Sequence, residues 1–210
     1  MDTSFYNLYN KEEKYTMLDT VNLHAPALLK DLEEATRAIG FTMGSDHLTG
    51  SLLRTLAATK PGGQLLELGT GTGFSAAWML DGMDARATLV SVDVNEQVTA
   101  IPLRYLGHDP RITFTTIDGQ AFIDSMLAQG TRFDLIFADM SPGKFHHVDE
   151  TLQLLKPGGL YIIDDLLLLT SWEEAHVMRV HRLLAMLEDR PDLRITKLNW
   201  STGLLIAASR

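Results

Sequence analysis

From residue 64 onward, short runs of apolar residues alternate with longer segments whose apolar residues recur every three or four positions. The short runs are rich in β-branched and aliphatic residues and are bounded by Gly, Pro, Asp or Asn, which is typical of strands. The longer segments have the periodicity of helices. Because strand and helix alternate, the pattern predicts an α/β fold with a parallel sheet and helices on both faces. The expected strands are Gln64–Leu68, Thr88–Val92, Ile112–Thr116, Phe133–Ala138 and Leu160–Ile163, and the expected helices are Phe74–Leu80, Glu96–Leu106, Ala121–Gln129 and Val148–Leu155.

Two further regions flank this alternating part. After the fifth run, Trp172–Glu188 has the pattern of one long helix, and Leu193–Leu198 and Thr202–Ala208 are expected to form a closing antiparallel pair. Before the first run, three helices are expected at about residues 12–20, 26–39 and 46–58. We therefore expect one domain, residues 1–210, in which a helical cap (residues 1–60) covers an α/β core (residues 61–210).

Composition narrows the classes of protein to which the chain can belong. The 210 residues include 18 basic and 27 acidic side chains, giving a formal net charge of −9, and no cysteine. Disulfides and cysteine-bound metals are excluded, and the acidic balance disfavours nucleic acid as a partner. The beginning of the sequence lacks a secretory signal, and the most apolar stretch, 160–169, is too short to span a bilayer. A cytoplasmic protein without membrane association is therefore expected.

A glycine-rich turn follows the first expected strand and opens the first helix. Gly69, Gly71 and Gly73 allow a tight turn, close approach of the backbone to a ligand, and helix amides that face it. The dinucleotide-binding fingerprint has its third glycine three positions after the second, whereas here the interval is two. An acidic residue, Glu67, precedes the turn, and Asp93 ends the next strand, where a carboxylate can accept hydrogen bonds from ribose hydroxyls. The turn therefore indicates a site for a nucleoside cofactor.

This pattern resembles the cofactor motif of Rossmann-like S-adenosylmethionine-dependent methyltransferases. Residues 41–50, 117–120, 133–139, 155–165 and 202–207 are similar, in order, to segments of the catechol and caffeoyl-CoA O-methyltransferase-like family. The resemblance implies the class I methyltransferase fold, with a seven-stranded, mostly parallel sheet, one antiparallel strand and a helical N-terminal extension. The cofactor-binding residues that it implies are Met43, Ser45, Glu67, Gly69, Thr70, Gly71, Gly73, Ser75, Asp93, Val94, Asp118, Gly119, Gln120 and Asp139.

Acidic residues end the fourth and fifth expected strands. If those strands are neighbours, Asp139 and Asp164 converge at about the 4.8 Å spacing of strands, and Asp165 follows directly. Clustered carboxylates repel one another unless a cation, a proton or strong hydrogen bonds intervene. The resemblance implies that these three residues hold a divalent cation, with Mg²⁺ the natural choice for oxygen ligands. Asp165 has an alternative interpretation, as the N-cap of the following segment.

The chain departs from the family pattern twice at this cluster. Asp165 stands where the family has Asn, and the lysine expected three residues after Asp139 is absent because position 142 is Pro. Lys144 follows Asp139 by five residues instead. Lys144 and Asp139 are the candidate catalytic residues, and Lys144 is the candidate base that accepts the proton of a substrate hydroxyl. The alternative is that Lys144 is a solvated loop lysine.

The leading hypothesis is an enzyme, an S-adenosylmethionine-dependent O-methyltransferase that acts on a hydroxyl of a small aromatic molecule. One alternative keeps the cofactor and takes a modified nucleoside in RNA as the acceptor. Others are a nicotinamide-dependent oxidoreductase and a partner protein that binds the cofactor without turnover. The resemblance also implies a homodimer, and no motif identifies the acceptor.

Overall fold

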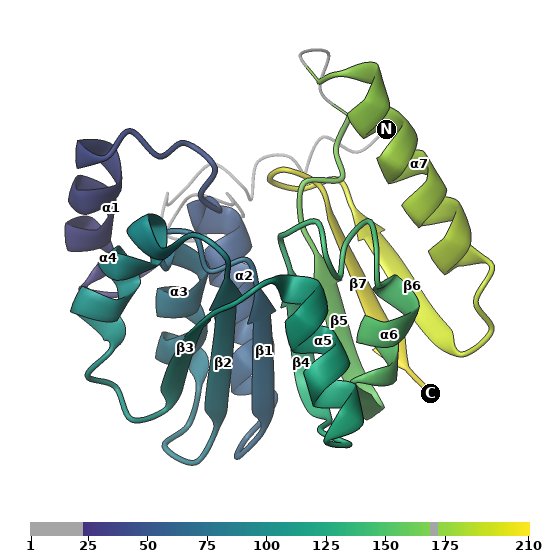
Figure 1. Cartoon of the computed structure of the whole chain (residues 1–210), viewed down its shortest axis with the longest axis horizontal. Coiled ribbons are helices and arrows are strands. Elements are labelled where there is room, and N and C mark those ends of the chain that lie inside the picture. Colours follow the sequence, from purple (N-terminus) through teal and green to yellow (C-terminus); the bar gives the residue numbers. More distant parts are fainter. Residues whose placement is uncertain (1–22, 169–171) are drawn as a thin grey trace, which may run out of the picture.

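The computed structural model describes residues 23–168 and 172–210, which form a central sheet of seven strands in the order β3-β2-β1-β4-β5-β7-β6 (Figure 1). The five strands β1 to β5 are mutually parallel, and β7 runs antiparallel to both of its neighbours. This confirms the expected mostly parallel sheet with one antiparallel strand. The strands are β1 Gln64–Leu68, β2 Thr88–Asp93, β3 Ile112–Thr116, β4 Phe133–Ala138, β5 Leu155–Ile163, β6 Leu193–Leu198 and β7 Leu204–Ser209.

Helices cover both faces of the sheet and create two hydrophobic cores. In Figure 1, α5 and α6 lie in front of the strands, and α2 and α3 lie behind them. Side chains of β1 alternate between the cores: Leu66 and Leu68 pack with α5, α6 and α7, whereas Leu65 packs with α1 to α4. The helices are α1 Leu29–Ala38, α2 His47–Ala58, α3 Phe74–Gly82, α4 Glu96–Leu106, α5 Gly119–Ala128, α6 Val148–Gln153 and α7 Glu174–Glu188.

Several boundaries differ from those that the sequence predicts. β5 begins at Leu155 rather than Leu160, because the Pro-Gly-Gly segment continues the strand through a shift of register against β4 instead of ending a helix. β7 begins at Leu204, since Gly203 (φ +85°) is part of the turn from β6. The helix expected at residues 12–20 lies outside the described residues. Within the described part of the chain, every helix is too short or too polar to cross a membrane.

The order of the strands determines where a ligand can bind. From β1 the chain adds β2 and β3 on one side of the sheet, and it then crosses to add β4 and β5 on the other side. The order of the strands therefore reverses between β1 and β4, and the carboxyl ends of these two strands flank that point. Crevices of open α/β sheets form at this point. Two backbone hydrogen bonds connect the loops there: Gly69 N donates to Val92 O at 2.9 Å, and Asp139 N donates to Leu68 O at 2.8 Å.

α2 and α3 are in close contact, and we predict that Gly50→Ala weakens this packing. A Cβ at Gly50 would lie 2.2 Å from Cδ1 of the fully buried Trp78. Overpacking of this kind costs about 1–3 kcal/mol, which exceeds the roughly 1 kcal/mol that alanine gains in a helix. Denaturant unfolding is expected to show a net loss of stability.

Gly44→Ala is the matched control, because nothing lies within 4 Å of a Cβ at that position. We expect its unfolding midpoint to stay at the wild-type value. A Gly50→Ala protein as stable as this control would contradict the packing described here.

Candidate functional site

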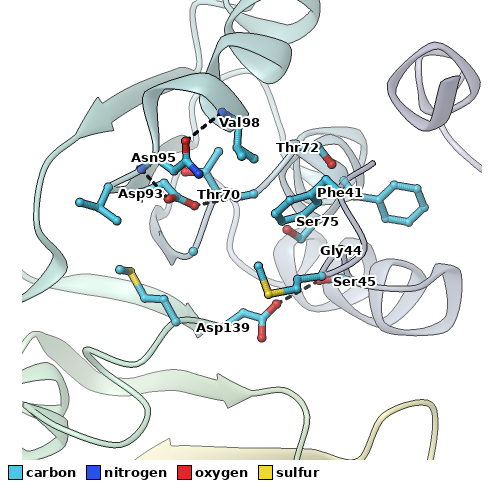
Figure 2. Close-up of a pocket in the computed structure, with 16 residues that line it drawn as sticks. Phe41, Gly44, Ser45, Thr70, Thr72, Ser75, Asp93, Asn95, Val98 and Asp139 are labelled. Carbon is cyan, nitrogen blue, oxygen red and sulfur yellow. Dashed lines mark hydrogen bonds between the residues drawn. The ribbon is translucent and has the colours of Figure 1, made fainter. Parts of the chain in front are cut away.

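A cavity of about 300 Å³ lies at the carboxyl ends of β1, β2 and β4. Figure 2 shows Asp93 and Asn95 on one side of it and Ser45 and Asp139 on another, with Phe41 and Ser75 between them. The cavity is within the size range of small-molecule sites. Of the residues expected to bind the cofactor, those that line it are Met43, Ser45, Gly69, Thr70, Gly71, Ser75, Asp93, Val94 and Asp139.

The glycines of the β1–α3 turn are required by its backbone. Gly69 (φ +108°) and Gly73 (φ +84°) both adopt conformations that other residues rarely take. A Cβ on Gly69 would lie 2.9 Å from the carbonyl carbon of Asp139, and one on Gly73 would lie 2.4 Å from Cβ of Pro102. The turn is therefore held against β4 on one side and α4 on the other, which leaves its inner surface open to the cavity.

Asp93 fixes the turn and faces the cavity at the same time. Its Oδ2 accepts a hydrogen bond from Gly71 N at 2.9 Å, and its Oδ1 accepts one from Asn95 N at 3.0 Å. Each carboxylate oxygen has a second lone pair, so both can still accept a hydrogen bond from a ligand hydroxyl. This arrangement agrees with the expected role of Asp93 toward a ribose.

Glu67 was expected among the cofactor-binding residues, but its side chain does not line the cavity. It is fully buried beneath the turn, where Ser75 Oγ donates to Oε1 at 2.5 Å and Ser91 Oγ donates to Oε2. Burial raises its pKa to about 7, although both serine hydrogen bonds oppose the increase. Glu67 therefore acts on the site indirectly, by joining β1, β2 and the first turn of α3.

The segment after β3 also lies outside the cavity lining. Asp118 accepts a hydrogen bond from Ala121 N at 3.0 Å and so caps α5, and Gln120 is exposed. Gly119 lies directly behind the cavity wall: a Cβ at this position would be 2.9 Å from Cε of Met140, which lines the cavity. Of the predicted residues, Glu67, Gly73, Asp118, Gly119 and Gln120 do not line the cavity.

Seven lining residues were not among the cofactor-binding residues predicted from the sequence. Asn95 could have been identified, because it follows Asp93 by two positions and has the residue type of a helix N-cap; its side chain accepts hydrogen bonds from Gln97 N and Val98 N. Thr72 lies within the glycine turn, and Phe41 and Gly44 lie in the segment 41–50, so these three could also have been identified. Phe74, Val98 and Met140 belong to no motif and line the cavity through the fold alone. The seven are Phe41, Gly44, Thr72, Phe74, Asn95, Val98 and Met140.

A second cavity, of about 610 Å³, adjoins the first. The two share Met43, Gly44, Ser45 and Asp139. The far side of the second cavity is formed by α7 and the residues before it, where the Trp172 and His176 rings meet edge to face with centroids 4.1 Å apart. The other lining residues are Thr42, Asp164, Asp165, Glu173, Arg179 and Thr202.

The carboxylates at the ends of β4 and β5 do converge, as the sequence predicts, because these strands are neighbours. Burial raises the pKa of Asp139 well above its ordinary value, while the Lys144 charge opposes this. Burial likewise raises the pKa of Asp164 to about 6. Asp164 accepts hydrogen bonds from Thr202 Oγ1 and, at 2.7 Å, from Asp165 N.

Lys144 is neither a solvated loop lysine nor part of a cavity wall. Its residue is 4% exposed, and its Nζ lies 3.5 Å from Asp139 Oδ1 and 3.5 Å from Asp165 Oδ2. It does not line either of the two cavities. A direct role as the base that contacts an acceptor, which the sequence suggested, is therefore not supported by this geometry.

The expected Mg²⁺ site does not fit the residues as they are arranged. Oδ1 of Asp164 already accepts two hydrogen bonds, and an ammonium group, not an open position, lies next to Asp139 and Asp165. Within residues 23–168 and 172–210, no group of three or more His, Cys, Asp or Glu could hold a metal ion. Asp165 (φ +58°) also does not cap a helix, since α7 begins only at Glu174.

Comparison with known proteins agrees with a cavity for a methyltransferase cofactor. A family model described as O-methyltransferase matches residues 19–209. A relative from Mycolicibacterium vanbaalenii, whose name assigns it to the O-methyltransferases, is 31% identical over 60% of this chain and 58% of its own length. A caffeoyl-CoA O-methyltransferase of Stellaria longipes is 26% identical over 66% of this chain and 61% of its own length. The chain thus spans less than two thirds of these relatives.

Solved structures share the fold at lower identity. An O-methyltransferase from Bacillus cereus in complex with SAH has a TM-score of 0.77 and 18% identity, covering 88% of this chain and 91% of its own. An O-methyltransferase from Streptomyces achromogenes, in complex with SAM and involved in tomaymycin synthesis, has a TM-score of 0.76 and 21% identity, covering 99% and 95%. These matches confirm the Rossmann-like methyltransferase fold.

The burial of Glu67 predicts a pH dependence of stability. The pKa of Glu67 is about 7 in the native state and 4.5 for an ordinary glutamate, so between these values the native state retains a proton that the unfolded chain loses. Stability conferred by the protonated form is therefore lost as pH rises through this window. Relative to a Glu67→Gln variant, we expect the wild type to lose about 2 kcal/mol of unfolding free energy between pH 5 and pH 8.

Denaturant unfolding at several pH values measures this difference, and other titrating groups cancel because both proteins carry them. Glu34→Gln, at an exposed position, is the control and should follow the wild type at every pH. If the difference between wild type and Glu67→Gln stayed constant with pH, Glu67 would not be buried as described.

Proposed function

Because the chain belongs to the O-methyltransferase family whose model matches residues 19–209, we propose that it transfers the methyl group of S-adenosylmethionine to a hydroxyl oxygen of a small aromatic molecule. The observation that carries this proposal is the pair of adjoining cavities. One is lined by the glycine turn and Asp93, and the other has the rings of Trp172 and His176 in its wall. Asp139 belongs to both, so a donor and an acceptor bound in the two cavities would meet beside it.

The first cavity suits S-adenosylmethionine. Asp93 is available to ribose hydroxyls, and residues of the turn line the space that the rest of the cofactor would fill. Bound SAH and SAM in the Bacillus cereus and Streptomyces achromogenes structures support the same cofactor for this chain. The sulfonium group supplies an electrophilic methyl, so the protein has mainly to align donor and acceptor.

The second cavity suits an aromatic acceptor. Trp172 and His176 offer ring faces and edges for stacking. A hydroxyl directed toward the first cavity would lie beside Asp139, whose carboxylate can accept the proton. The acceptor oxygen then bonds to the methyl carbon as the carbon–sulfur bond breaks, and the electron pair of that bond stays on sulfur. No metal ion is part of this proposal.

The alternatives receive less support. A nicotinamide-dependent oxidoreductase does not agree with the family assignment or with the spacing of the three glycines. A net charge of −9 does not favour an RNA acceptor. A cytoplasmic location and a homodimer stay predictions from the sequence.

Calorimetry with S-adenosylhomocysteine tests the cofactor site. We expect Asp93→Asn to weaken binding about tenfold or more, because a hydrogen bond to a charged acceptor contributes about 1.5–3 kcal/mol. Asp118→Asn is the matched control: Asp118 was also expected to contact the cofactor, but it caps α5 outside the cavity. Its affinity should be unchanged. If both variants lost affinity for S-adenosylhomocysteine equally, or if neither lost any, the result would contradict the proposed site.

Turnover with a panel of small hydroxylated aromatics, such as catechol and caffeate, tests the reaction. Release of S-adenosylhomocysteine is the readout, and we expect Asp139→Asn to lower kcat by about 10² or more, the usual contribution of a general base. Cofactor binding without turnover on any acceptor would instead favour a non-catalytic protein. Turnover on RNA alone would favour the nucleoside acceptor.

A further inference from the structure

The loop between β4 and α6 directs Lys144 toward the interior of the molecule. Gly143 (φ +85°) lies so close to β1 that a Cβ there would be 2.5 Å from Leu68 Cδ1. Its amide donates to His146 O at 2.7 Å, and its carbonyl accepts a hydrogen bond from the hydroxyl of the buried Tyr161 on β5. The loop is therefore attached to two strands, and the direction of the residue after Gly143 is fixed.

Aromatic side chains cover the lysine from outside. Its Nζ lies 5.5 Å from the centroid of the Phe145 ring. Phe145 is in turn packed edge to face against His176 of α7, with ring centroids 5.4 Å apart. Because the side chain is enclosed in this way, its ammonium group stays next to Asp139 and Asp165, at 3.5 Å from an oxygen of each.

We propose that the Lys144 ammonium is a built-in counter-ion that takes the place of a divalent cation at the Asp139–Asp164–Asp165 cluster, so that the protein needs no metal there. Three carboxylates at one edge of a sheet require positive charge or hydrogen-bond donors. Oδ1 of Asp164 has two donors, Thr202 Oγ1 and Asp165 N. Asp139 and Asp165 instead share the ammonium.

The geometry also disfavours addition of an ion beside the lysine. Mg²⁺ binds oxygen at about 2.0–2.1 Å in a nearly octahedral shell, and the oxygens of Asp139 and Asp165 are arranged around an ammonium with much longer contacts. An ion that entered would have to displace Lys144 from beneath Phe145. Lys144 lines neither of the two cavities, so it is a positioning residue: it acts on an acceptor only through Asp139 and Asp165.

Electron paramagnetic resonance of free Mn²⁺ tests the inference without requiring turnover. The wild-type protein should leave added Mn²⁺ free, whereas Lys144→Met, which keeps the length of the side chain but removes its charge, should bind one Mn²⁺ at least tenfold more tightly. Lys156→Met is the matched control, because Lys156 pairs with the single carboxylate of Asp134 at 2.7 Å. Removing that lysine should create no Mn²⁺ site.

Stoichiometric Mn²⁺ binding by the wild type would overturn the inference, and this result does not depend on whether Lys144→Met folds. The inference would also be overturned if a folded Lys144→Met variant bound Mn²⁺ no more tightly than the wild type. Lys144→Arg, which keeps the charge, should resemble the wild type.

The catalytic consequence rests on the proposed function. Wild-type turnover should be unchanged after treatment with a chelator, and Lys144→Met turnover should fall and recover in part with Mn²⁺. Wild-type turnover abolished by the chelator and restored by Mg²⁺ would contradict the inference. If no protein turned over any acceptor, the proposed function would fail, and the Mn²⁺ titrations would still decide the role of Lys144.

Discussion

The closeness of the β1 and β4 ends is the constraint on which the rest of the site depends. Asp139 N donates to Leu68 O, and Gly69 is so close to the Asp139 carbonyl that only a glycine fits. This contact brings the glycine turn and the acidic end of β4 to one point. Because Asp139 then belongs to the walls of both cavities, their relative position is set by backbone geometry and not by flexible side chains.

Two buried acids support this junction in different ways. Glu67 lies beneath the turn, where burial favours a protonated carboxyl near neutral pH and two serine hydroxyls provide hydrogen bonds to its oxygens. Asp139 lies beside the turn and pairs with the ammonium of Lys144. Burial raises the pKa of both, but the neighbours differ: hydroxyls hold Glu67 as a part of the scaffold, whereas a positive charge beside Asp139 favours the ionised form that can accept a proton.

The sequence predicts the parts of this site that are local. The strands, the glycine turn and the acid at the end of β2 each come from a few consecutive residues, and all are present. The direction of the Glu67 side chain is set by the β1 pleat, in which Glu67 alternates with Leu66 and Leu68 and so points away from the core that they share. The inward direction of Lys144 depends on Tyr161 and Leu68, which are distant in sequence, and spacing alone does not reveal such contacts.

The two departures of this chain from the family pattern can be understood as a single change. Replacing the family's Asn by Asp165 adds a negative charge to a cluster that already holds Asp139 and Asp164, and taken alone it would increase repulsion. Moving the lysine to position 144, behind a Pro-Gly turn, adds a positive charge at the point where Asp139 and Asp165 approach each other. Each change is costly without the other, and together they place a positive charge of the chain itself between two of the three carboxylates. A covalently attached ammonium cannot be lost to a chelator, but its position depends on one loop, so the packing of Gly143 against β1 and of Phe145 against α7 becomes a condition of the chemistry beside it.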